Sequence, residues 1–422
     1  MVNAVIETAR ARRLFWTAYS PPEGDSEPTD PLAFDMYSER LGNLIVPGVT
    51  SRTVRLRYLG MVCAGLRLTG RAVSEASGRN IVRERRKAFL PFERGWAFAI
   101  TLGAEGRIKE SLPGSGRASL RERYRGFRGA NLALAHYRRT QTEARVHPFN
   151  YRFLAAAGSQ GGLGAYLVTL DYGGFVDRST LTLRGPGHAL ADAFLGATAG
   201  KAARLVTNHK VRRGDLAAAG QAFDLGAASS EERNLVRQGL FADHRTLAEA
   251  CRLIDTTSTG RTAEEALRAV TRHNGDSLEQ AAQYALDFEP VRQLGLATFA
   301  RLGEQLPALN GPAAFNQVAN SVSEPALQLR EAAQRLALRT PPASLIPLGT
   351  LAQDLATASN EPEVISVLLR WHGLHRTPWI AEVLPETYEL RRHGMFREPT
   401  TFHGYTVDSA LSLFAEAERK ST

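Results

Sequence analysis

The sequence predicts a mainly α-helical fold with one short β-hairpin near its centre. Apolar residues recur at the three- and four-residue spacing of a helix face through most of the 422-residue chain. The alternating, β-branched pattern of a strand occurs in one short run, residues 180–183. A hydroxyl residue three positions before a glutamate marks a capped helix start. Such pairs recur in the C-terminal half at Ser229 with Glu232, Thr246 with Glu249, and Thr262 with Glu265.

The bulk composition is that of an ordinary globular protein, with 43% hydrophobic and 23% charged residues. The length allows two or three domains and a core that needs no disulfide or metal. Cys63 and Cys251 are the only cysteines, which fits a reducing compartment and excludes a four-thiolate zinc site. No run of about 18 apolar residues occurs, so no membrane span is expected. We therefore expect a cytoplasmic protein without a cofactor or bound metal.

Residues 1–147 are predicted to form a basic helical N-terminal region. Pro47 and Gly48 end its first helix, and Pro91 is expected to interrupt its third because proline lacks the N–H that helices use. Glycine, serine and proline in residues 103–118 predict an exposed loop. The expected helices cover residues 31–46, 51–68, 73–90, 92–102 and 120–139.

Residues 148–200 carry the most informative order of elements. Helices are expected over 149–157 and 163–172, then the run 180–183, then a helix that follows Gly185. Helix, turn, helix, strand and "Leu-Thr-Leu-x-Gly" before another helix resembles the second half of a bacterial winged-helix domain. The resemblance implies that the Leu-Thr pair holds the wing in the core. A helical bundle with one β-hairpin fits the same spacing.

The winged-helix resemblance also implies which residues approach a nucleic-acid groove. Ser159, Gln160, Tyr166 and Thr169 are expected near the helix that enters it. That helix has no Lys or Arg, which weakens the case for reading bases and leaves a purely protein-joining winged helix as an alternative.

Residues 201–422 are predicted to form a C-terminal helical domain. Pro341 and Pro342 break the helical pattern, and no fixed sequence period indicates a solenoid. The later helices are expected over residues 277–288, 291–306, 312–338, 361–371 and 406–419.

Basic residues are concentrated in one segment. Residues 52–139 hold 20 Lys and Arg against 6 Asp and Glu, whereas residues 151–422 hold 27 against 29. A one-sided basic surface is typical of a polyphosphate binder, because each neutralised phosphate releases counterions. A solvated helix face and a surface for an acidic protein are the alternatives. The predicted nucleic-acid-binding residues are Arg79, Arg83, Arg85, Arg86, Lys87, Arg121, Arg123, Arg125, Arg128, Arg138 and Arg139.

No catalytic residue or metal ligand is predicted. His372 and His375 have a spacing that can share a metal on a helix, but Gly373 and Pro378 suggest that the helix ends there, so packing is favoured. Arg followed five residues later by His, at Arg268–His273 and Arg370–His375, resembles the active-site pair of a helical ribonuclease family. The polar residue that this family prefers after the arginine is Ala269 or Trp371 here.

Several strings are also similar to one group of bacterial proteins. They include residues 30–32, 41–43, 47–52, 160–166 and 181–183, with 371–379 as a looser counterpart. Together they resemble uncharacterised accessory proteins encoded beside helicases and nucleases in anti-phage defence islands. The resemblance implies an accessory role in defence and supplies no activity.

We therefore expect a nucleic-acid-binding, non-catalytic subunit of a bacterial defence or DNA-processing complex. It would position a partner helicase or nuclease and would bind DNA in preference to RNA. Two other classes stay open. One is a helical ribonuclease or toxin-like effector, and the other is a scaffold whose basic face docks an acidic protein.

Overall fold

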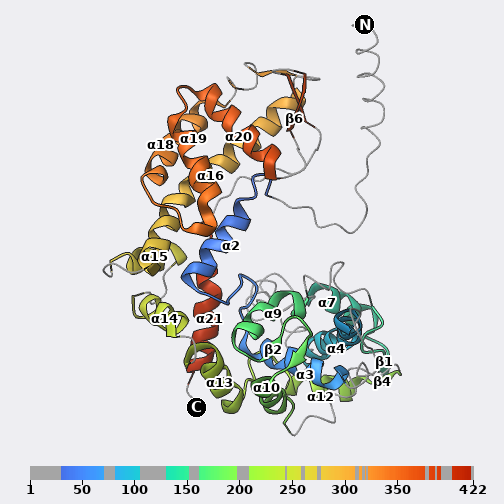
Figure 1. Ribbon diagram of the computed structural model, residues 1–422. Coiled ribbons are helices and arrows are strands. Elements are labelled where there is room, and N and C mark those ends of the chain that lie inside the picture. Colours follow the sequence, from blue (N-terminus) through green and yellow to red (C-terminus); the bar gives the residue numbers. More distant parts are fainter. Residues whose placement is uncertain are drawn as a thin grey trace. The chain divides into compact units, whose positions relative to one another are not determined.

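The protein is mainly α-helical, as predicted (Figure 1). It was analysed as a computed structural model that describes residues 30–70, 81–104, 130–151, 161–196, 209–242, 245–257, 262–272, 277–308, 313–315, 319, 322–375, 380–384, 387–390 and 402–419. The chain forms two compact units, each built from two segments. Unit 1 comprises residues 1–41 and 262–403, and unit 2 comprises residues 42–261 and 404–422.

These units divide the chain differently from the three predicted ranges. The predicted boundaries after residues 147 and 200 both lie inside unit 2, and the range 201–422 is shared between the units. The physical reason is burial of the central helix α3 (Leu56–Gly70), which is covered by helices from all three ranges.

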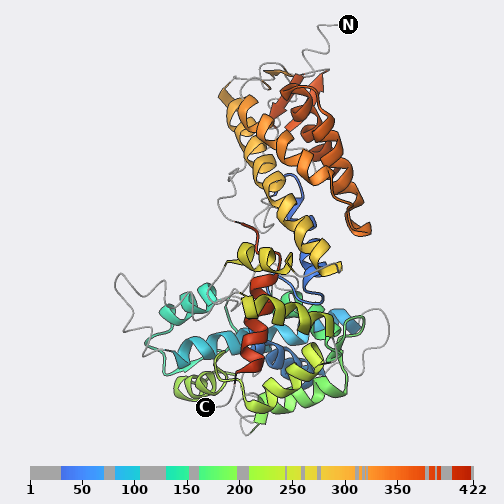
Figure 2. The ribbon, with the colours of Figure 1, turned by 90° about the vertical axis from the view of Figure 1, so that its left-hand side faces the viewer.

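Unit 2 is arranged around α3, whose residues from Leu56 to Leu66 are all buried. Small residues let its neighbours approach, since a Cβ on Gly65 would lie 2.5 Å from the Phe89 ring. The helices that pack on α3 are α4 (Ile81–Gly103), α9 (Gly162–Tyr172), α10 (Gly185–Leu195), α13 (Ser230–Val236) and α21 (Val407–Glu418). Figure 2 shows these elements in a second view.

Helix α4 continues through Pro91, so the predicted break there is wrong. A proline inside a helix costs about 3 kcal/mol. Phe89, Phe92 and Trp96 are fully buried, and each such side chain contributes about 1.5–3 kcal/mol. Burial on both sides of the proline therefore outweighs its local cost.

The rest of unit 2 consists of short elements at its edges. Helix α12 (Arg213–Ala222) crosses α4 so closely that a Cβ on Gly220 would lie 1.7 Å from the carbonyl oxygen of Ala99. Two antiparallel pairs of two-residue strands are present, β1 (Arg145–Val146) with β4 (Val211–Arg212) and β2 (Val176–Asp177) with β3 (Thr182–Leu183). The remaining elements are α7 (Ala130–Arg139), the π-helix η4 (Arg237–Ala242) and α14 (Arg245–Thr257).

Two of the three predicted capping boxes are confirmed. In both α13 and α15 (Ala263–Val270), the cap residue and the glutamate exchange hydrogen bonds, for Ser229 with Glu232 and for Thr262 with Glu265. The third is not a cap, because α14 already begins at Arg245 and Thr246 lies in its first turn.

Unit 1 is built on the 32-residue helix α16 (Ser277–Ala308), which packs against α15 and α18 (Ser323–Ala337). The prediction of two helices separated near residue 290 is wrong, because α16 continues through Pro290. Helix α18 begins at residue 323 rather than 312, and residues 313–314 form β5 (Ala313–Ala314). The predicted break at Pro341–Pro342 is confirmed, since α18 ends at Ala337.

Four further elements of unit 1 were not predicted, namely a 3-10 helix, an α-helix and two strands. The 3-10 helix η5 (Ala343–Leu345) leads into α19 (Ile346–Thr357). After α20 (Glu361–His375), strands β6 (Ile380–Leu384) and β7 (Thr387–Leu390) form an antiparallel sheet of order β5–β7–β6. Unit 1 also receives the start of α2 (Phe34–Ile45), up to Leu41. Within the described ranges, no helix combines the length and the apolar character that crossing a membrane requires.

Candidate nucleic-acid interface

The basic excess of the protein belongs to unit 2. Unit 2 holds 36 Lys and Arg against 20 Asp and Glu, a net charge of +16. Unit 1 holds 16 against 23, a net charge of −7. Any attraction of the protein for a polyanion is therefore expected to come from unit 2.

The first basic cluster is one face of α4, which we call the α4 basic face. Arg83, Arg86 and Lys87 are three and four residues apart, which places them on one side of the helix, and all three are exposed. Lys87 pairs with Glu84 at 2.8 Å. Arg83 and Arg86 have no ion-pair partner within the described part of the chain, so their charges are available to a ligand.

A hairpin loop adjoins the α4 basic face. The Arg85 guanidinium donates a 2.7 Å hydrogen bond from Nη1 to the carbonyl oxygen of Thr180, in the loop between β2 and β3. Asp177 holds the loop closed by accepting from the amide of Ser179 at 2.8 Å and from its hydroxyl at 2.6 Å. These bonds lower the pKa of Asp177. The loop also carries the exposed Arg178 and therefore extends the basic surface of α4.

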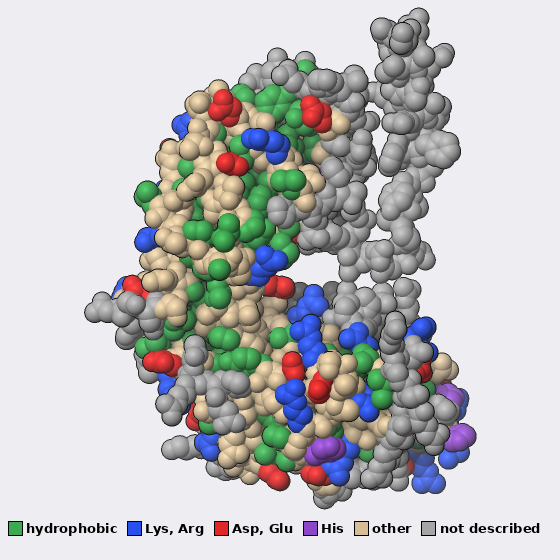
Figure 3. Space-filling model, in the orientation of Figure 1, with side chains coloured by type: hydrophobic (Ala, Val, Ile, Leu, Met, Phe, Trp, Pro, Cys, Tyr) green, Lys and Arg blue, Asp and Glu red, His purple; other side chains and the backbone are tan. Residues whose placement is uncertain are grey.

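The second group, which we call the β1–β4 cluster, comprises Arg138, Arg139, Arg145, Lys210 and Arg212. Arg145 and Arg212 are exposed and lie directly opposite each other in the β1–β4 pairing. Like charges in this arrangement destabilise a strand pair, so a bound anion would relieve their repulsion. Lys210 is 3.3 Å from Glu143. Figure 3 shows Lys and Arg side chains gathered where unit 2 carries β1 and β4.

Arg213 anchors the β1–β4 cluster rather than contributing an exposed charge. Its Nη1 donates a 2.6 Å hydrogen bond to the carbonyl oxygen of Thr140, just after α7. Its guanidinium lies 5.1 Å from the centre of the buried Tyr137 ring. These contacts join the end of α7 to the start of α12, which brings Arg138 and Arg139 next to the strands. Tyr137 thus packs in the core and cannot stack on a base.

Three arginines of the basic segment do not belong to the interface. Arg57 is buried, 4% exposed, and pairs with Glu232 beneath the Phe194 ring. Burial raises the pKa of Glu232 and lowers that of Arg57, and attraction between the two opposes both shifts. Arg55 and Arg67 are paired with Glu416 and Asp192, respectively.

The predicted site residues are thus only partly located. Arg83, Arg86, Lys87, Arg138 and Arg139 are exposed as expected, and Arg85 is half-buried with its guanidinium bound to the hairpin loop. The other predicted contacts, Arg79, Arg121, Arg123, Arg125 and Arg128, lie outside the described residues.

Helix α9 does not present the predicted groove-facing residues. Tyr166 and Thr169 are fully buried, so their predicted place beside a nucleic-acid groove is wrong. The Tyr166 ring stacks on Tyr58 with centroids 4.5 Å apart, and Thr169 is hydrogen-bonded to Thr53 at 3.1 Å. Ser159 and Gln160 lie outside the described residues. The strand predicted after α9 is present as β3, and Leu181 beside it is buried.

Sequence reasoning missed Arg145, Lys210 and Arg212. Residues 145 and 212 are distant in the chain, and each belongs to a strand of only two residues. Alternation over two residues is too short to indicate a strand. Arg212 and Arg213 form a basic dipeptide, but nothing in the sequence indicates that residue 145 lies opposite residue 212.

The histidine and arginine pairs noted in the sequence either make structural contacts or include residues outside the described part of the chain. His372 is buried, its Nδ1 is 2.7 Å from the carbonyl oxygen of Pro31, and burial lowers its pKa. Trp371 donates to the carbonyl oxygen of Leu32 at 2.9 Å, so this end of α20 packs as expected. Among the described residues, no group of three or more His, Cys, Asp or Glu could hold a metal. Arg268 pairs with Glu264, and His273 and the His375 side chain lie outside the described part.

Comparison of the chain with protein-family models, with curated proteins and with solved structures gives no match. The resemblance to defence-island accessory proteins therefore stays a prediction.

Proposed function

We propose that unit 2 binds nucleic acid through its phosphate backbone, using the α4 basic face and the β1–β4 cluster. The observation that carries the proposal is the opposed pair Arg145 and Arg212, exposed on a unit with a net charge of +16. An arrangement that costs stability in the free protein gains stability when a phosphate lies between or beside the two guanidinium groups.

The contacts available are those of backbone binding rather than base reading. Arg83, Arg86 and Arg145 present flexible cations to solvent, and the face of α9 that a winged helix would use is packed in the core. Arginine forks suit phosphate oxygens, and such contacts give affinity without sequence information. The hairpin loop beside α4 would follow the backbone as a wing does. We take duplex DNA as the ligand in preference to RNA, and its dense, regular phosphates favour it over single strands.

We infer a non-catalytic role for this binding within a larger assembly. In this proposal the protein is a cytoplasmic subunit of a bacterial defence or DNA-processing complex and positions a partner helicase or nuclease on DNA. The resemblance of the sequence to accessory proteins of defence islands supports this role. Cys63 and Cys251 are both buried thiols, in keeping with a reducing compartment.

A salt titration of binding tests the proposal. Fluorescence anisotropy with labelled duplex DNA, single-stranded DNA and duplex RNA should show duplex DNA bound most tightly, with log K falling linearly against log salt concentration. A control protein of equal net charge but scattered cations should bind more weakly. Equal binding by the control, or retention of an acidic polypeptide in preference to all three nucleic acids, would overturn the proposal and favour the protein scaffold.

A further inference from the structure

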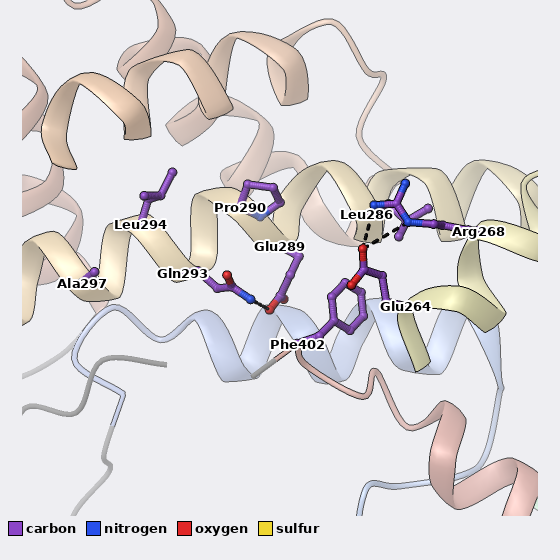
Figure 4. Close-up of a pocket in the computed structure, with 9 residues that line it drawn as sticks. All are labelled: Glu264, Arg268, Leu286, Glu289, Pro290, Gln293, Leu294, Ala297 and Phe402. Atoms are coloured by element: carbon purple, nitrogen blue, oxygen red, sulfur yellow. Dashed lines mark hydrogen bonds and ion pairs between the residues drawn. The ribbon is translucent and has the colours of Figure 1, made fainter. Parts of the chain in front are cut away.

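Unit 1 contains two adjoining clefts that share Arg268, Leu286 and Pro290. The first has a volume of about 470 Å³ and follows α16 from Leu286 to Ala297 (Figure 4). The second has a volume of about 350 Å³ and opens among α15, α16 and α18. Both volumes fall in the range of small-molecule sites, roughly 300–1,000 Å³.

The two clefts differ in character. The first has an apolar wall, formed by Leu286, Pro290, Leu294, Ala297 and Phe402. The second has a cationic rim of three arginines, Arg268 of α15, Arg272 just after it and Arg335 of α18. Together they present an apolar surface next to a positively charged one.

The acidic residues of both clefts are already neutralised. Glu264 accepts two bonds from Arg268, and Asp287 accepts from Arg339 at 2.7 Å and from Gln283 at 3.1 Å. Glu289 is buried, pairs with Arg292, and also accepts from Gln293 and from the amide of His403. The carboxylates therefore cannot balance further cations in the clefts.

Arg272 and Arg335 are the cations left over. Both side chains are exposed, and neither guanidinium group has an ion-pair or hydrogen-bond partner within the ranges that the structure describes. They come from different elements yet line one cleft, in a unit whose net charge is −7. Two unpaired guanidinium groups around one small cleft favour a compact anion, and phosphate monoesters match their fork geometry.

We propose that this double cleft binds a nucleoside monophosphate. Arg272 and Arg335, with Arg268 between the two clefts, hold the phosphate. The base lies on the apolar wall, where Pro290 and the Phe402 ring offer flat surfaces. The site is in unit 1, so it is separate from the proposed nucleic-acid interface and does not depend on it.

Calorimetric titration of the full chain with adenosine monophosphate tests this site, with inorganic phosphate and adenosine as separate probes. We expect adenosine monophosphate to bind, and the Arg272→Ala/Arg335→Ala double variant to bind it at least about tenfold more weakly. Phe402→Ala should weaken binding of the nucleotide and leave that of inorganic phosphate unchanged. Arg370→Ala, which removes an exposed arginine elsewhere in unit 1, is the matched control.

Three results would overturn the proposal. These are no detectable binding of adenosine monophosphate, adenosine bound as tightly as the monophosphate, or wild-type affinity in the double variant. Circular dichroism verifies that each variant is folded. Duplex DNA binding is measured on the same samples, so that a loss in unit 1 is distinguished from a loss in unit 2.

Discussion

Arg145 and Arg212 face each other across the two-residue β1–β4 ladder, with both side chains exposed. The neighbouring pair, Val146 and Val211, turns toward the interior, and Val146 is fully buried. The ladder therefore holds two cations on its outer face by burying apolar side chains on its inner one. Because the two guanidinium groups repel each other, changing them should affect binding and stability in opposite directions.

Replacing Arg212 with alanine should weaken duplex DNA binding and leave the protein as stable as before, or more stable. One lost phosphate contact reduces the slope of log K against log salt by about 0.9. Removing one of two opposed cations also relieves a repulsion of roughly 0.2–1 kcal/mol. Anisotropy titrations at several salt concentrations and thermal melting measure the two effects.

The control for Arg212→Ala is Arg237→Ala, which removes an exposed arginine of unit 2 that lies in neither cluster and whose guanidinium donates to the Asn234 side chain. It should change the salt slope little. If both variants lose the same affinity, the binding follows net charge alone and the β1–β4 cluster has no special part in it.

The separation of the two clusters predicts a minimum length of duplex. Arg85 contacts the hairpin loop, and Phe98, 13 residues further along α4, packs on His136 of α7 with centroids 4.5 Å apart. A helix rises 1.5 Å per residue, so these points are about 20 Å apart, the length of roughly 6 base pairs. A duplex must exceed this length to contact both clusters.

We therefore expect affinity to rise steeply once the duplex exceeds roughly 6 base pairs and slowly on much longer duplexes. On long duplexes, both Arg83→Ala/Arg86→Ala and Arg145→Ala/Arg212→Ala should weaken binding. On short ones, only one of the two pairs should matter. A gradual rise with length, with equal effects of both pairs at all lengths, would contradict binding of one duplex by both clusters.

The fold was predictable where local signals and burial agree. The apolar spacing predicted α3 and α9, and Ser229 and Thr262 marked two helix starts correctly. Prediction failed at Pro91 and Pro290, because burial on both sides keeps each helix continuous. Local sequence carries no measure of that burial.

The candidate interface was predictable only in part, for a different reason. Charge counting found Arg83, Arg86, Arg138 and Arg139, which are exposed. Charge counting could not distinguish these exposed arginines from the buried Arg57. The ion-pair partner of Arg57 is Glu232, which is too distant in the sequence to be recognised as its partner. For the same reason the pairing of residues 145 and 212 had no sequence signal.

The crossing of α4 and α12 should tolerate no side chain at Gly220. A Cβ there would lie 1.7 Å from the carbonyl oxygen of Ala99, a backbone atom that cannot move aside without shifting α4. We expect Gly220→Ala to destabilise unit 2 by about 1–3 kcal/mol or more. Gly226→Ala, where the nearest atom is 3.4 Å away, is the control and should be nearly neutral. Urea unfolding followed by circular dichroism compares the two, and equal midpoints would disprove the close crossing.

Unit 1 should lose stability in mild acid because of His372. To donate to the carbonyl oxygen of Pro31, 2.7 Å away, its Nδ1 must carry the proton of a neutral ring, and burial lowers its pKa below the ordinary 6.5. The unfolded chain therefore binds a proton at a higher pH than the folded chain does. Stability is complete above about pH 6.5 and falls as the pH drops through that value toward the folded-state pKa.

His372→Asn separates this titration from the hydrogen bond. The amide of asparagine can still donate to Pro31, but it does not titrate, so the variant should lose less stability than the wild type between about pH 7.5 and pH 5. Some loss should remain, because burial also lowers the pKa of His403 in the same unit. His188→Asn, at an exposed position of α10, should keep the full wild-type dependence. An identical acid loss in His372→Asn and the wild type would show that His372 is not the group responsible.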